Sequence, residues 1–365
     1  MKVIIAGGGT GGHLFPGLAI AEEFKRRDEN NEVVFVGTEH GIEARIIPRE
    51  GYPIKFVRSE GIVGKSLFKM LKATAELVLS AIDAHRILKA LAPDMVIGVG
   101  GYSSGAIVLI AGLRSIPTMI HEQNSVPGLT NKLLGKIVKR VCVTYHESIT
   151  SFPMGKTFFT GNPIRGKIVK GDRDAACRLF SLAGDMFTVF IFGGSSGARS
   201  INRTMVDALN HLTDLRDKIQ FLHQTGDKDF ENIRDAYRKA GVKGTVAPFI
   251  YQMAEAYAVA DVVVSRAGAT TLAEITALGK PAILVPYPYA AGRHQEFNAV
   301  KLREMGAAFM MHEDEMRGET LANNIRELYE NEALRMEMRR SSQGLGRPDA
   351  CGRIVDIAMN IVRSG

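Results

Sequence analysis

The chain carries two glycine-rich turns, each of which follows a short apolar run and precedes a segment with helical periodicity. The first run, residues 2–6, leads into Gly7–Gly12, and the second, residues 187–192, leads into Gly193–Ala198. Such a turn lets the backbone approach a ligand closely and directs N–H groups and a helix dipole at an anion. One turn of this kind occurs in any Rossmann-type protein. Two of them, one opening each half of the chain, predict twin α/β domains that face a shared cleft.

Strand-like and helix-like segments alternate along the whole chain, which is the pattern of parallel sheets covered by helices. The length of 365 residues also favours two domains, because single cores stop growing at roughly 250–300 residues. The predicted strands are residues 3–6, 33–36, 54–57, 95–99, 118–120 and 140–143 in the first half and 188–192, 220–223, 245–247, 262–265 and 282–285 in the second. We expect the seam near residues 160–165 and, after a break at 344–348, a final amphipathic helix over 349–362.

The composition, with 45% apolar and 23% charged residues, is that of a water-soluble globular protein. No segment approaches the roughly 18 uninterrupted apolar residues that would span a bilayer. Three cysteines (Cys142, Cys177 and Cys351) lack metal-ligand spacing and fit a reducing cytoplasm. The net charge of +7 suits acidic small ligands, an anionic membrane surface or nucleic acid, and does not choose among them.

The first turn, Gly7–Gly12, satisfies the G-x-G-x-x-G pattern in the expected context between a strand and a helix. Its default interpretation is a dinucleotide site, for which Glu39 is placed to serve as the acidic residue after the second strand. However, His13 follows the turn directly, where an oxidoreductase has no evident use for it. A histidine at a helix start is either a solvated or capping residue or a catalytic one, and the spacing leaves both open.

Two further polar segments follow predicted strands. Residues 121–124 (His-Glu-Gln-Asn) come directly after a buried strand, and residues 99–105 end the preceding strand at the same edge, where open α/β sheets bind ligands. In the second half, Thr271 and Glu274 have the spacing of a capping box. Glu274 is equally well placed at a strand end to accept both hydroxyls of a ribose, and spacing alone does not separate these readings.

Two basic groups lie in the first half of the chain. Lys65, Lys69 and Lys72 share one helical face, with apolar residues interleaved. The second group is Lys132, Lys136, Lys139 and Arg140. Each group is compatible with a solvated helix face. Together they are also compatible with a surface that lies on anionic lipid, at about 1 kcal/mol per basic residue.

Six motifs occur in order along nearly the whole chain: Gly8-Gly9-Thr10-Gly11-Gly12-His13-x-x-Pro16, Gly100-Gly101-Tyr102, His121-Glu122-Gln123-Asn124, Gly161-Asn162-Pro163-x-Arg165, Gly193-Gly194-Ser195-x-Gly197-Ala198, and Ser265-Arg266-Ala267-Gly268 through Glu274. Together they resemble the MurG family of bacterial glycosyltransferases, within family 28. That family transfers N-acetylglucosamine (GlcNAc) from UDP to undecaprenyl-diphosphoryl-N-acetylmuramoyl-pentapeptide (lipid I), making lipid II for peptidoglycan.

The resemblance implies a GT-B fold, in which two Rossmann-like domains with doubly wound parallel sheets face a cleft. Residues 1–161 would form the N-terminal domain with the acceptor and membrane face, and residues 162–346 the domain that binds the donor UDP-GlcNAc. Residues 347–365 would form a helix that packs back on the N-terminal domain. The expected location is the cytoplasmic face of the cell membrane, on its anionic inner leaflet, with no nucleic acid as partner.

The resemblance also implies roles for individual residues. In the donor site, Arg165 and Ser195 would contact the diphosphate, Ile250 the uracil, Glu274 the ribose and Gln295 the sugar. From the first half, Thr10, Gly11, Gly12 and Asn124 would also reach the donor, while Tyr102, His121, Glu122 and Asn202 would lie near His13 on the acceptor side. Two positions depart from the family pattern: Ser196 stands where Gln is common, and His294 stands where many relatives have a second Gln.

The implied reaction inverts the anomeric configuration, as the muramoyl C4 hydroxyl attacks and UDP leaves. It needs a base for the hydroxyl and a sink for charge on the diphosphate. We expect His13 as the base, with Glu122 as second candidate, and the start of the helix after Gly193–Ala198 with Arg165 as the sink. No Asp-x-Asp motif follows a predicted strand, so we expect neither a metal nor a cofactor.

Three alternatives remain open from the sequence. The first is another GT-B transferase that uses a UDP-sugar, for example one acting on a natural product. The second is an NAD-dependent oxidoreductase that uses Gly7–Gly12 and Glu39. The third is a nucleotide-binding epimerase, which also combines twin α/β domains with UDP-GlcNAc. Binding of uridine nucleotides and NADH would separate the oxidoreductase from the others.

Overall fold

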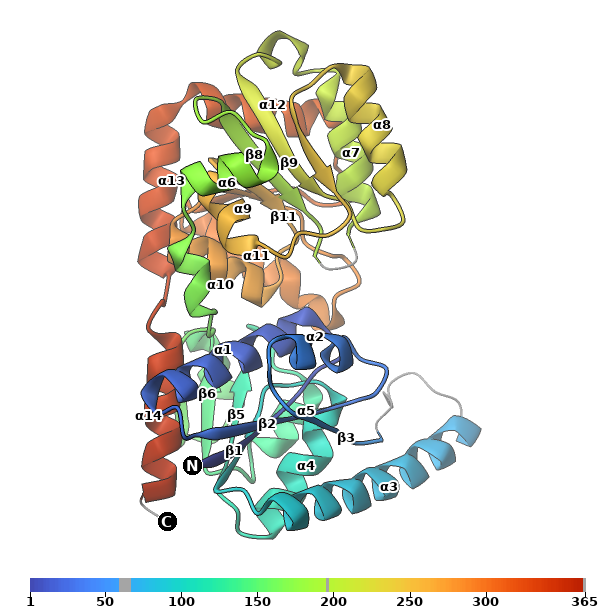
Figure 1. The fold of residues 1–365 in the computed structure, drawn as a ribbon, viewed down its shortest axis with the longest axis vertical. Coiled ribbons are helices and arrows are strands. Elements are labelled where there is room, and N and C mark those ends of the chain that lie inside the picture. Colours follow the sequence, from blue (N-terminus) through green and yellow to red (C-terminus); the bar gives the residue numbers. More distant parts are fainter. Residues whose placement is uncertain (59–66, 195–196, 364–365) are drawn as a thin grey trace. The chain divides into compact units, whose positions relative to one another are not determined.

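The computed structural model describes residues 1–58, 67–194 and 197–363, apart from the side chains of residues 67–77 and Tyr102. The chain divides into two compact units (Figure 1): unit 1 comprises residues 1–165 and 347–365, and unit 2 comprises residues 166–346. The first division comes shortly after the predicted seam at 161/162 and assigns Arg165 to unit 1.

Unit 1 is built on a seven-stranded parallel sheet with the order β3-β2-β1-β4-β5-β6-β7. Its strands are β1 (Lys2–Ala6), β2 (Glu32–Gly37), β3 (Ile54–Phe56), β4 (Met95–Gly98), β5 (Thr118–Glu122), β6 (Arg140–Val143) and β7 (Thr157–Phe159). Its helices are α1 (Gly11–Arg27), α2 (Glu43–Arg49), α3 (Leu67–Leu91), α4 (Tyr102–Leu113), α5 (Leu129–Leu134), the 3₁₀ helix η1 (His146–Ser151) and α14 (Ala350–Arg363).

Unit 2 is built on a six-stranded parallel sheet with the order β10-β9-β8-β11-β12-β13. Its strands are β8 (Phe187–Phe192), β9 (Ile219–Gln224), β10 (Gly244–Ala247), β11 (Val262–Ser265), β12 (Ala282–Leu284) and β13 (Ala308–Met310). Its helices are α6 (Arg173–Phe180), α7 (Arg199–Leu209), α8 (Phe230–Ala240), α9 (Met253–Val259), α10 (Ala269–Leu278), α11 (His294–Glu304), α12 (Gly318–Glu330) and α13 (Glu332–Leu345), with the 3₁₀ helices η2 (Gly166–Lys170), η3 (Thr213–Leu215) and η4 (Ala291–Arg293).

Both sheets are covered on two faces, as the apolar runs in the sequence predict. Side chains of a strand alternate between faces. In β1, Val3 and Ile5 enter one core cluster while Ile4 enters another. In β8, Val189 and Phe190 likewise belong to clusters on opposite faces. The predicted α/β class with two Rossmann-like parallel sheets is therefore confirmed.

Two of the four edge strands, β7 and β13, are absent from the sequence-based assignment. Each has three residues and pairs with one neighbour at the end of its sheet. A run that short gives a weak strand signal, although β3 and β12, of the same length, are predicted. The predicted strands do recover the centre of both sheets, where the candidate ligand-binding edges lie.

The C-terminal helix α14 packs within unit 1, beside α1 (Figure 1). Its buried residues Ile354, Val355 and Ala358 join the core cluster that contains Leu18 and Phe24 of α1. On the rim of this contact, the Arg27 guanidinium bonds the Asp356 carboxylate and the Gly352 carbonyl oxygen. Apolar burial and a polar rim thus attach the end of the chain to its first helix.

We predict that Ile354→Ala lowers the free energy of unfolding of unit 1 by about 2–5 kcal/mol, because it leaves a cavity where a fully buried side chain packs. Urea-induced unfolding followed by circular dichroism measures the change. The matched control is Arg353→Ala on the exposed side of the same helix, for which we expect a change within about 0.5 kcal/mol. Equal effects of both substitutions would contradict the packing assigned to α14.

Candidate functional site

In unit 1, the carboxyl ends of β1, β4 and β5 bring three predicted segments to one edge of the sheet. These strands are neighbours in the parallel sheet, so the turn after β1, the glycines after β4 and the polar residues at the end of β5 follow one another along that edge. Ligands of open α/β sheets bind at this edge. The segments that the sequence singles out in unit 1 therefore share one location.

His13 lies in the first turn of α1, and its ring is held by another loop. Its Nδ1 atom lies 3.2 Å from Oε1 of Gln123, which follows β5. The backbone of Gly100 passes so close that a Cβ there would lie 2.5 Å from His13 Nδ1, and its φ of +93° also favours glycine. His13 is half-buried, so it is not a fully solvated side chain. The N-cap of α1 is Thr10, not His13, and Thr10 makes no side-chain cap hydrogen bond. Neither a solvated nor a capping role therefore accounts for the contacts of His13.

Glu122 is buried, and its carboxylate accepts hydrogen bonds from four donors. These are the Asn124 N–H at 2.9 Å, the Gly128 N–H at 3.1 Å, and the side-chain amides of Asn131 at 2.9 Å and Asn124 at 3.4 Å. A carboxylate with this many donors organises the loop between β5 and α5. Between the two candidate bases, the geometry favours His13.

The first glycine turn contains a carboxylate that the sequence reasoning missed. Glu43 is buried at the start of α2, and its Oε2 atom accepts the Gly9 N–H at 2.8 Å. Its Oε1 atom accepts both the N–H and the hydroxyl of Thr38 at 2.9 Å. Glu39, which the dinucleotide reading requires, is exposed. The anion position of this turn is thus taken by the protein itself, and a pyrophosphate there would meet a buried negative charge.

The remaining unit 1 candidates occupy different environments. Thr10 and Gly12 are exposed and Gly11 is half-buried where the turn enters α1, and Asn124 is half-buried. Tyr102 begins α4, but its side chain lies outside the described residues.

His121 is buried, and its Nε2 atom lies 3.0 Å from the Gly161 carbonyl oxygen. Because a carbonyl oxygen only accepts hydrogen bonds, the proton of the ring is on Nε2. Burial lowers the pKa of His121 to about 4.

Arg165 is buried, and its Nε atom has no hydrogen-bond partner among the described residues. Its guanidinium lies over the Phe15 ring at 4.8 Å from the centroid. Its Nη1 atom lies 3.5 Å from the Glu50 carboxylate. These contacts tie the last residue of this part of unit 1 to α1 and to the end of α2.

In unit 2, the second glycine turn connects β8 to α7. Gly197 adopts a φ of +74°, and its N–H donates to the Gly194 carbonyl oxygen at 3.0 Å. Ser195 and Ser196 lie outside the described residues. In the described part of this turn, no carboxylate accepts a hydrogen bond. The start of a helix such as α7 stabilises an anion through its N–H groups and dipole.

Gln224, at the end of β9, links this turn to the segment that contains Ile250. Its Nε2 donates to the Gly194 carbonyl oxygen at 2.9 Å, and its Oε1 accepts the Ile250 N–H at 2.8 Å. Ile250 is itself buried in the core. Sequence reasoning missed Gln224, although a polar residue ending an apolar strand was the available signal.

Glu274 does not form the capping box that its spacing allows. The helix α10 begins at Ala269 with Gly268 as N-cap, so Thr271 already lies inside the helix. The Glu274 carboxylate accepts the Tyr257 hydroxyl at 2.8 Å, which orients it. Gln295 lies in α11 and accepts the Tyr287 N–H at 3.0 Å through Oε1, so its NH₂ end is the one that can face a ligand.

Asn202 lies in unit 2 and is buried in a polar network. Its Nδ2 atom donates to the Thr225 carbonyl oxygen and to Asp229, both at 2.9 Å. Its Oδ1 accepts from His223 at 3.1 Å, and the other ring nitrogen of His223 contacts the Tyr237 hydroxyl at 3.0 Å. Burial lowers the pKa of His223 to about 3, so the network is uncharged at that ring. These contacts give Asn202 a structural role in unit 2, and its place on the acceptor side stays a prediction.

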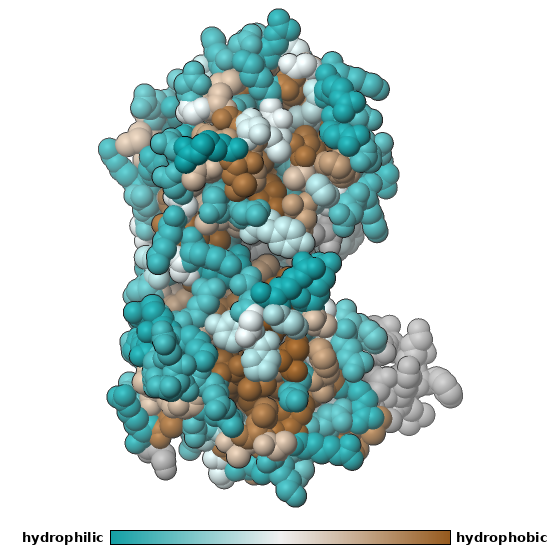
Figure 2. Space-filling view, viewed as in Figure 1, coloured by the Kyte–Doolittle hydropathy of each residue, from teal (hydrophilic) through white to brown (hydrophobic). Residues whose placement is uncertain are grey.

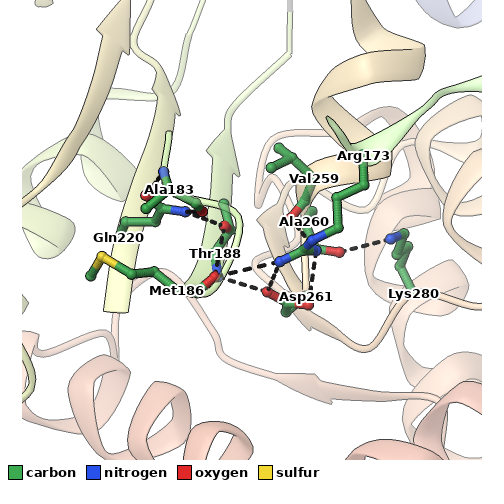
Figure 3. Close-up of polar contacts among 9 residues, drawn as sticks. All are labelled: Arg173, Ala183, Met186, Thr188, Gln220, Val259, Ala260, Asp261 and Lys280. Atoms are coloured by element: carbon green, nitrogen blue, oxygen red, sulfur yellow. Dashed lines mark hydrogen bonds and ion pairs between the residues drawn. The ribbon is translucent and has the colours of Figure 1, made fainter. Parts of the chain in front are cut away.

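A second polar cluster in unit 2 lies at the amino ends of the strands (Figure 3), opposite the candidate edge. Arg173 makes paired contacts with the Asp261 carboxylate at 3.2 Å, and the Thr188 N–H donates to the same carboxylate at 2.8 Å. Lys280 donates to the Ala260 carbonyl oxygen at 2.7 Å, and burial lowers its pKa to about 8. The cluster joins α6 to strand starts and is structural.

In the described ranges, no group of three or more His, Cys, Asp or Glu side chains has the arrangement of a metal site. Burial raises the pKa of both Cys142 and Cys351 to about 12, which makes these thiols unreactive. None of the helices in the same ranges combines the length and apolar composition needed to cross a bilayer.

Comparison with known proteins connects this geometry to a family. Residues 3–143 match the N-terminal domain, and residues 188–354 the C-terminal domain, of glycosyltransferase family 28. A relative from Thermodesulfovibrio yellowstonii is 47% identical over 100% of this chain and 99% of its own length. It is named UDP-N-acetylglucosamine–N-acetylmuramyl-(pentapeptide) pyrophosphoryl-undecaprenol N-acetylglucosamine transferase.

Solved structures agree with this assignment. MurG of Acinetobacter baumannii superimposes with a TM-score of 0.77 at 31% identity, covering 98% of this chain and 99% of its own. The UDP-GlcNAc 2-epimerase of Neisseria meningitidis gives a TM-score of 0.70 at 14% identity over 99% of this chain and 100% of its own, which shows a shared fold alone. The chain therefore belongs to glycosyltransferase family 28, in the group that contains these N-acetylglucosamine transferases.

Proposed function

We propose that this protein transfers GlcNAc from UDP-GlcNAc to the C4 hydroxyl of lipid I, with inversion at the anomeric carbon. The proposal rests on one observation, that the two glycine turns differ in whether a carboxylate of the protein accepts a hydrogen bond from them. In the first, the Gly9 N–H donates to Glu43 and the helix that follows carries His13, whereas in the described part of the second, which excludes Ser195 and Ser196, no carboxylate accepts a hydrogen bond. This arrangement supports donor binding in unit 2 and proton transfer from unit 1. It argues against a dinucleotide on Gly7–Gly12.

Donor binding in unit 2 follows from the groups along its carboxyl edge. The N–H groups at the start of α7 would bind the diphosphate, since a helix N-terminus stabilises an anion. Glu274, oriented by Tyr257, would accept the ribose hydroxyls, and the Ile250 carbonyl would meet the uracil. Arg165, which is held by Phe15 and Glu50 and whose Nε makes no hydrogen bond to a described residue, would add its positive charge to the sink for the leaving group.

In the transfer step, His13 Nε2 removes the proton from the acceptor hydroxyl. The hydroxyl oxygen forms the new bond to the anomeric carbon as the bond to the β-phosphate oxygen breaks. The electron pair of that bond leaves with UDP, where backbone N–H groups stabilise the developing charge. Each atom and charge is thus accounted for without a metal ion.

A surface on unit 1 would hold the lipid-linked acceptor. Leu129, Leu133 and Ile137 are 67%, 56% and 48% exposed, and Lys132 and Lys136 lie exposed among them. Figure 2 shows that apolar residues also gather over unit 1 on the face it presents. The side chains of Lys69 and Lys72, and all of Lys65, lie outside the described residues. Exposed apolar residues among lysines are suited to an anionic lipid surface, and we place the protein on the inner leaflet of the cell membrane.

The direct test is transfer of GlcNAc to a soluble, short-chain lipid I analogue, assayed with EDTA and without added divalent ions. We expect product with inverted configuration. Calorimetric titration should also show binding of UDP and UDP-GlcNAc but not of NADH, because Glu43 closes the first turn to a pyrophosphate. Binding of NADH, or no transfer in EDTA while the fold is intact, would contradict the proposal.

We expect His13→Ala to lower kcat by about 10²–10⁴-fold, the usual contribution of a general base, with little change in KM for UDP-GlcNAc. Steady-state kinetics on the soluble acceptor measures both. The control is His40→Ala, which removes an exposed histidine of the same unit and should leave kcat unchanged. Glu122→Gln should act mainly on thermal stability. If the kcat of Glu122→Gln falls as far as that of His13→Ala while the fold is retained, the assignment of the base to His13 alone is wrong.

We expect the variant Lys132→Glu/Lys136→Glu/Lys139→Glu to bind anionic vesicles at least about a hundredfold more weakly, since each basic residue contributes about 1 kcal/mol. Its kcat on the soluble acceptor should stay near that of the parent protein. Vesicle co-sedimentation with phosphatidylglycerol at fixed ionic strength gives the measurement. The same number of reversals at exposed Arg238, Lys239 and Lys243 of unit 2 controls for net charge. Equal weakening in both variants would place the lipid contact elsewhere.

A further inference from the structure

We propose that Gln123 is the positioning residue that fixes His13 in the tautomer with its proton on Nδ1, and thereby makes Nε2 the basic atom. The inference deepens the proposed function, since it concerns the group assigned there as the base. The sequence places Gln123 in a motif, residues 121–124, but predicts no role for it.

The orientation of the Gln123 amide follows from its second contact. One end of the amide lies 2.7 Å from the Val99 carbonyl oxygen. A carbonyl oxygen only accepts hydrogen bonds, so the amide end facing it must be the NH₂ group. With Oε1 there instead, two acceptors would face each other at hydrogen-bond distance. The other end of the amide, which faces His13, is therefore Oε1.

The tautomer of His13 follows in turn. Oε1 of an amide is an acceptor, so the His13 Nδ1 atom at 3.2 Å must carry a proton to form the bond. In a neutral imidazole the lone pair then lies on Nε2. The opposite tautomer would set the Nδ1 lone pair against Oε1 and would lose the bond. A base that accepts a proton from a hydroxyl needs the lone pair on the atom that faces the substrate.

The surroundings prevent Gln123 from turning away. Its side chain is 1% exposed, so an unmade hydrogen bond at either end would not be replaced readily by water. The backbone of Gly100 also leaves no room for a Cβ beside His13 Nδ1. The amide, the Val99 carbonyl and the glycine thus restrict the orientation of the ring at its Nδ1 edge.

A neutral amide in this position differs in effect from the carboxylate found beside many catalytic histidines. A carboxylate would stabilise the imidazolium and raise the pKa of the ring. Among the described residues, His121 interacts electrostatically with His13, and burial keeps His121 neutral. Gln123 orients the His13 ring without adding a charge beside it.

The experiment is ¹⁵N NMR of the protein labelled at histidine, with the His13 signals identified by their loss in His13→Ala. In the parent protein we expect a protonated Nδ1 and an unprotonated Nε2 at pH above the ring pKa. Gln123→Met removes the acceptor and should give exchange-averaged shifts of a tautomer mixture. Its kcat should fall by about 10- to 100-fold, as is usual for loss of a group that orients a functional histidine, with KM for UDP-GlcNAc unchanged.

A second variant, Gln123→Glu, keeps an acceptor on Nδ1–H and adds a negative charge. It should retain the tautomer and move the acid limb of the kcat/KM profile to higher pH, since a carboxylate raises the pKa of the ring and the base stays protonated over a wider range. Gln343→Glu, on an exposed face of unit 2, is the control and should move neither readout.

The outcomes separate this inference from the proposed function. An Nε2-protonated His13 in the parent protein, or an unchanged tautomer and pH profile in both Gln123 variants, would overturn the role of Gln123 whatever the activity. A fixed Nδ1–H tautomer that Gln123→Met releases would support that role, even if GlcNAc transfer were not detected. Thermal unfolding of each variant verifies that the fold is retained.

Discussion

A buried carboxylate must be surrounded by donors, and Glu43 has one donor, the Gly9 N–H, in the turn after β1 and two more, the Thr38 N–H and hydroxyl, directly after β2. The bond to the Gly9 N–H ties this turn to the segment after β2, so the shape of the turn depends on a residue in another loop. The start of α1, and with it His13, is set by that shape. The same bond consumes an N–H group that a phosphate would use. One interaction therefore positions the candidate base and makes the two glycine turns chemically different.

Other buried polar side chains hold the candidate edges in the same way. Glu122 accepts hydrogen bonds from the loop before α5. Gln123 is hydrogen-bonded both to the backbone that follows β4 and to His13. Gln224 is hydrogen-bonded both to the turn before α7 and to Ile250. Each lies where a parallel strand ends and a loop must begin. Because these groups are satisfied in one arrangement only, they specify loop geometry that the apolar core does not reach. The edges thereby obtain a definite structure from residues that need not touch a ligand.

The sequence predicts the parts of this structure that local patterns encode. Apolar runs locate the central strands of both sheets, and glycine turns locate the edges, because strand and turn signals are contained within a few residues. The short edge strands β7 and β13 lack that signal. The partners of the site residues lack it too. Gly9 and Glu43 are 34 positions apart, and His13 and Gln123 are 110 positions apart, so only the folded sheet brings them together.

The first glycine turn illustrates why a motif and its function separate. G-x-G-x-x-G specifies a backbone that can approach an anion, because glycine permits positive φ and lacks a Cβ. The pattern does not specify which anion. Here the anion is the Glu43 carboxylate, supplied by the chain, and the exposed Glu39 has no ribose to bind in this turn. With that position filled, the neighbouring helix start is available for proton transfer rather than for phosphate binding. The better match to a dinucleotide fingerprint is thus the turn in which the Gly9 N–H already binds a carboxylate, whereas in the described part of the turn before α7, with the poorer match, no carboxylate accepts a hydrogen bond.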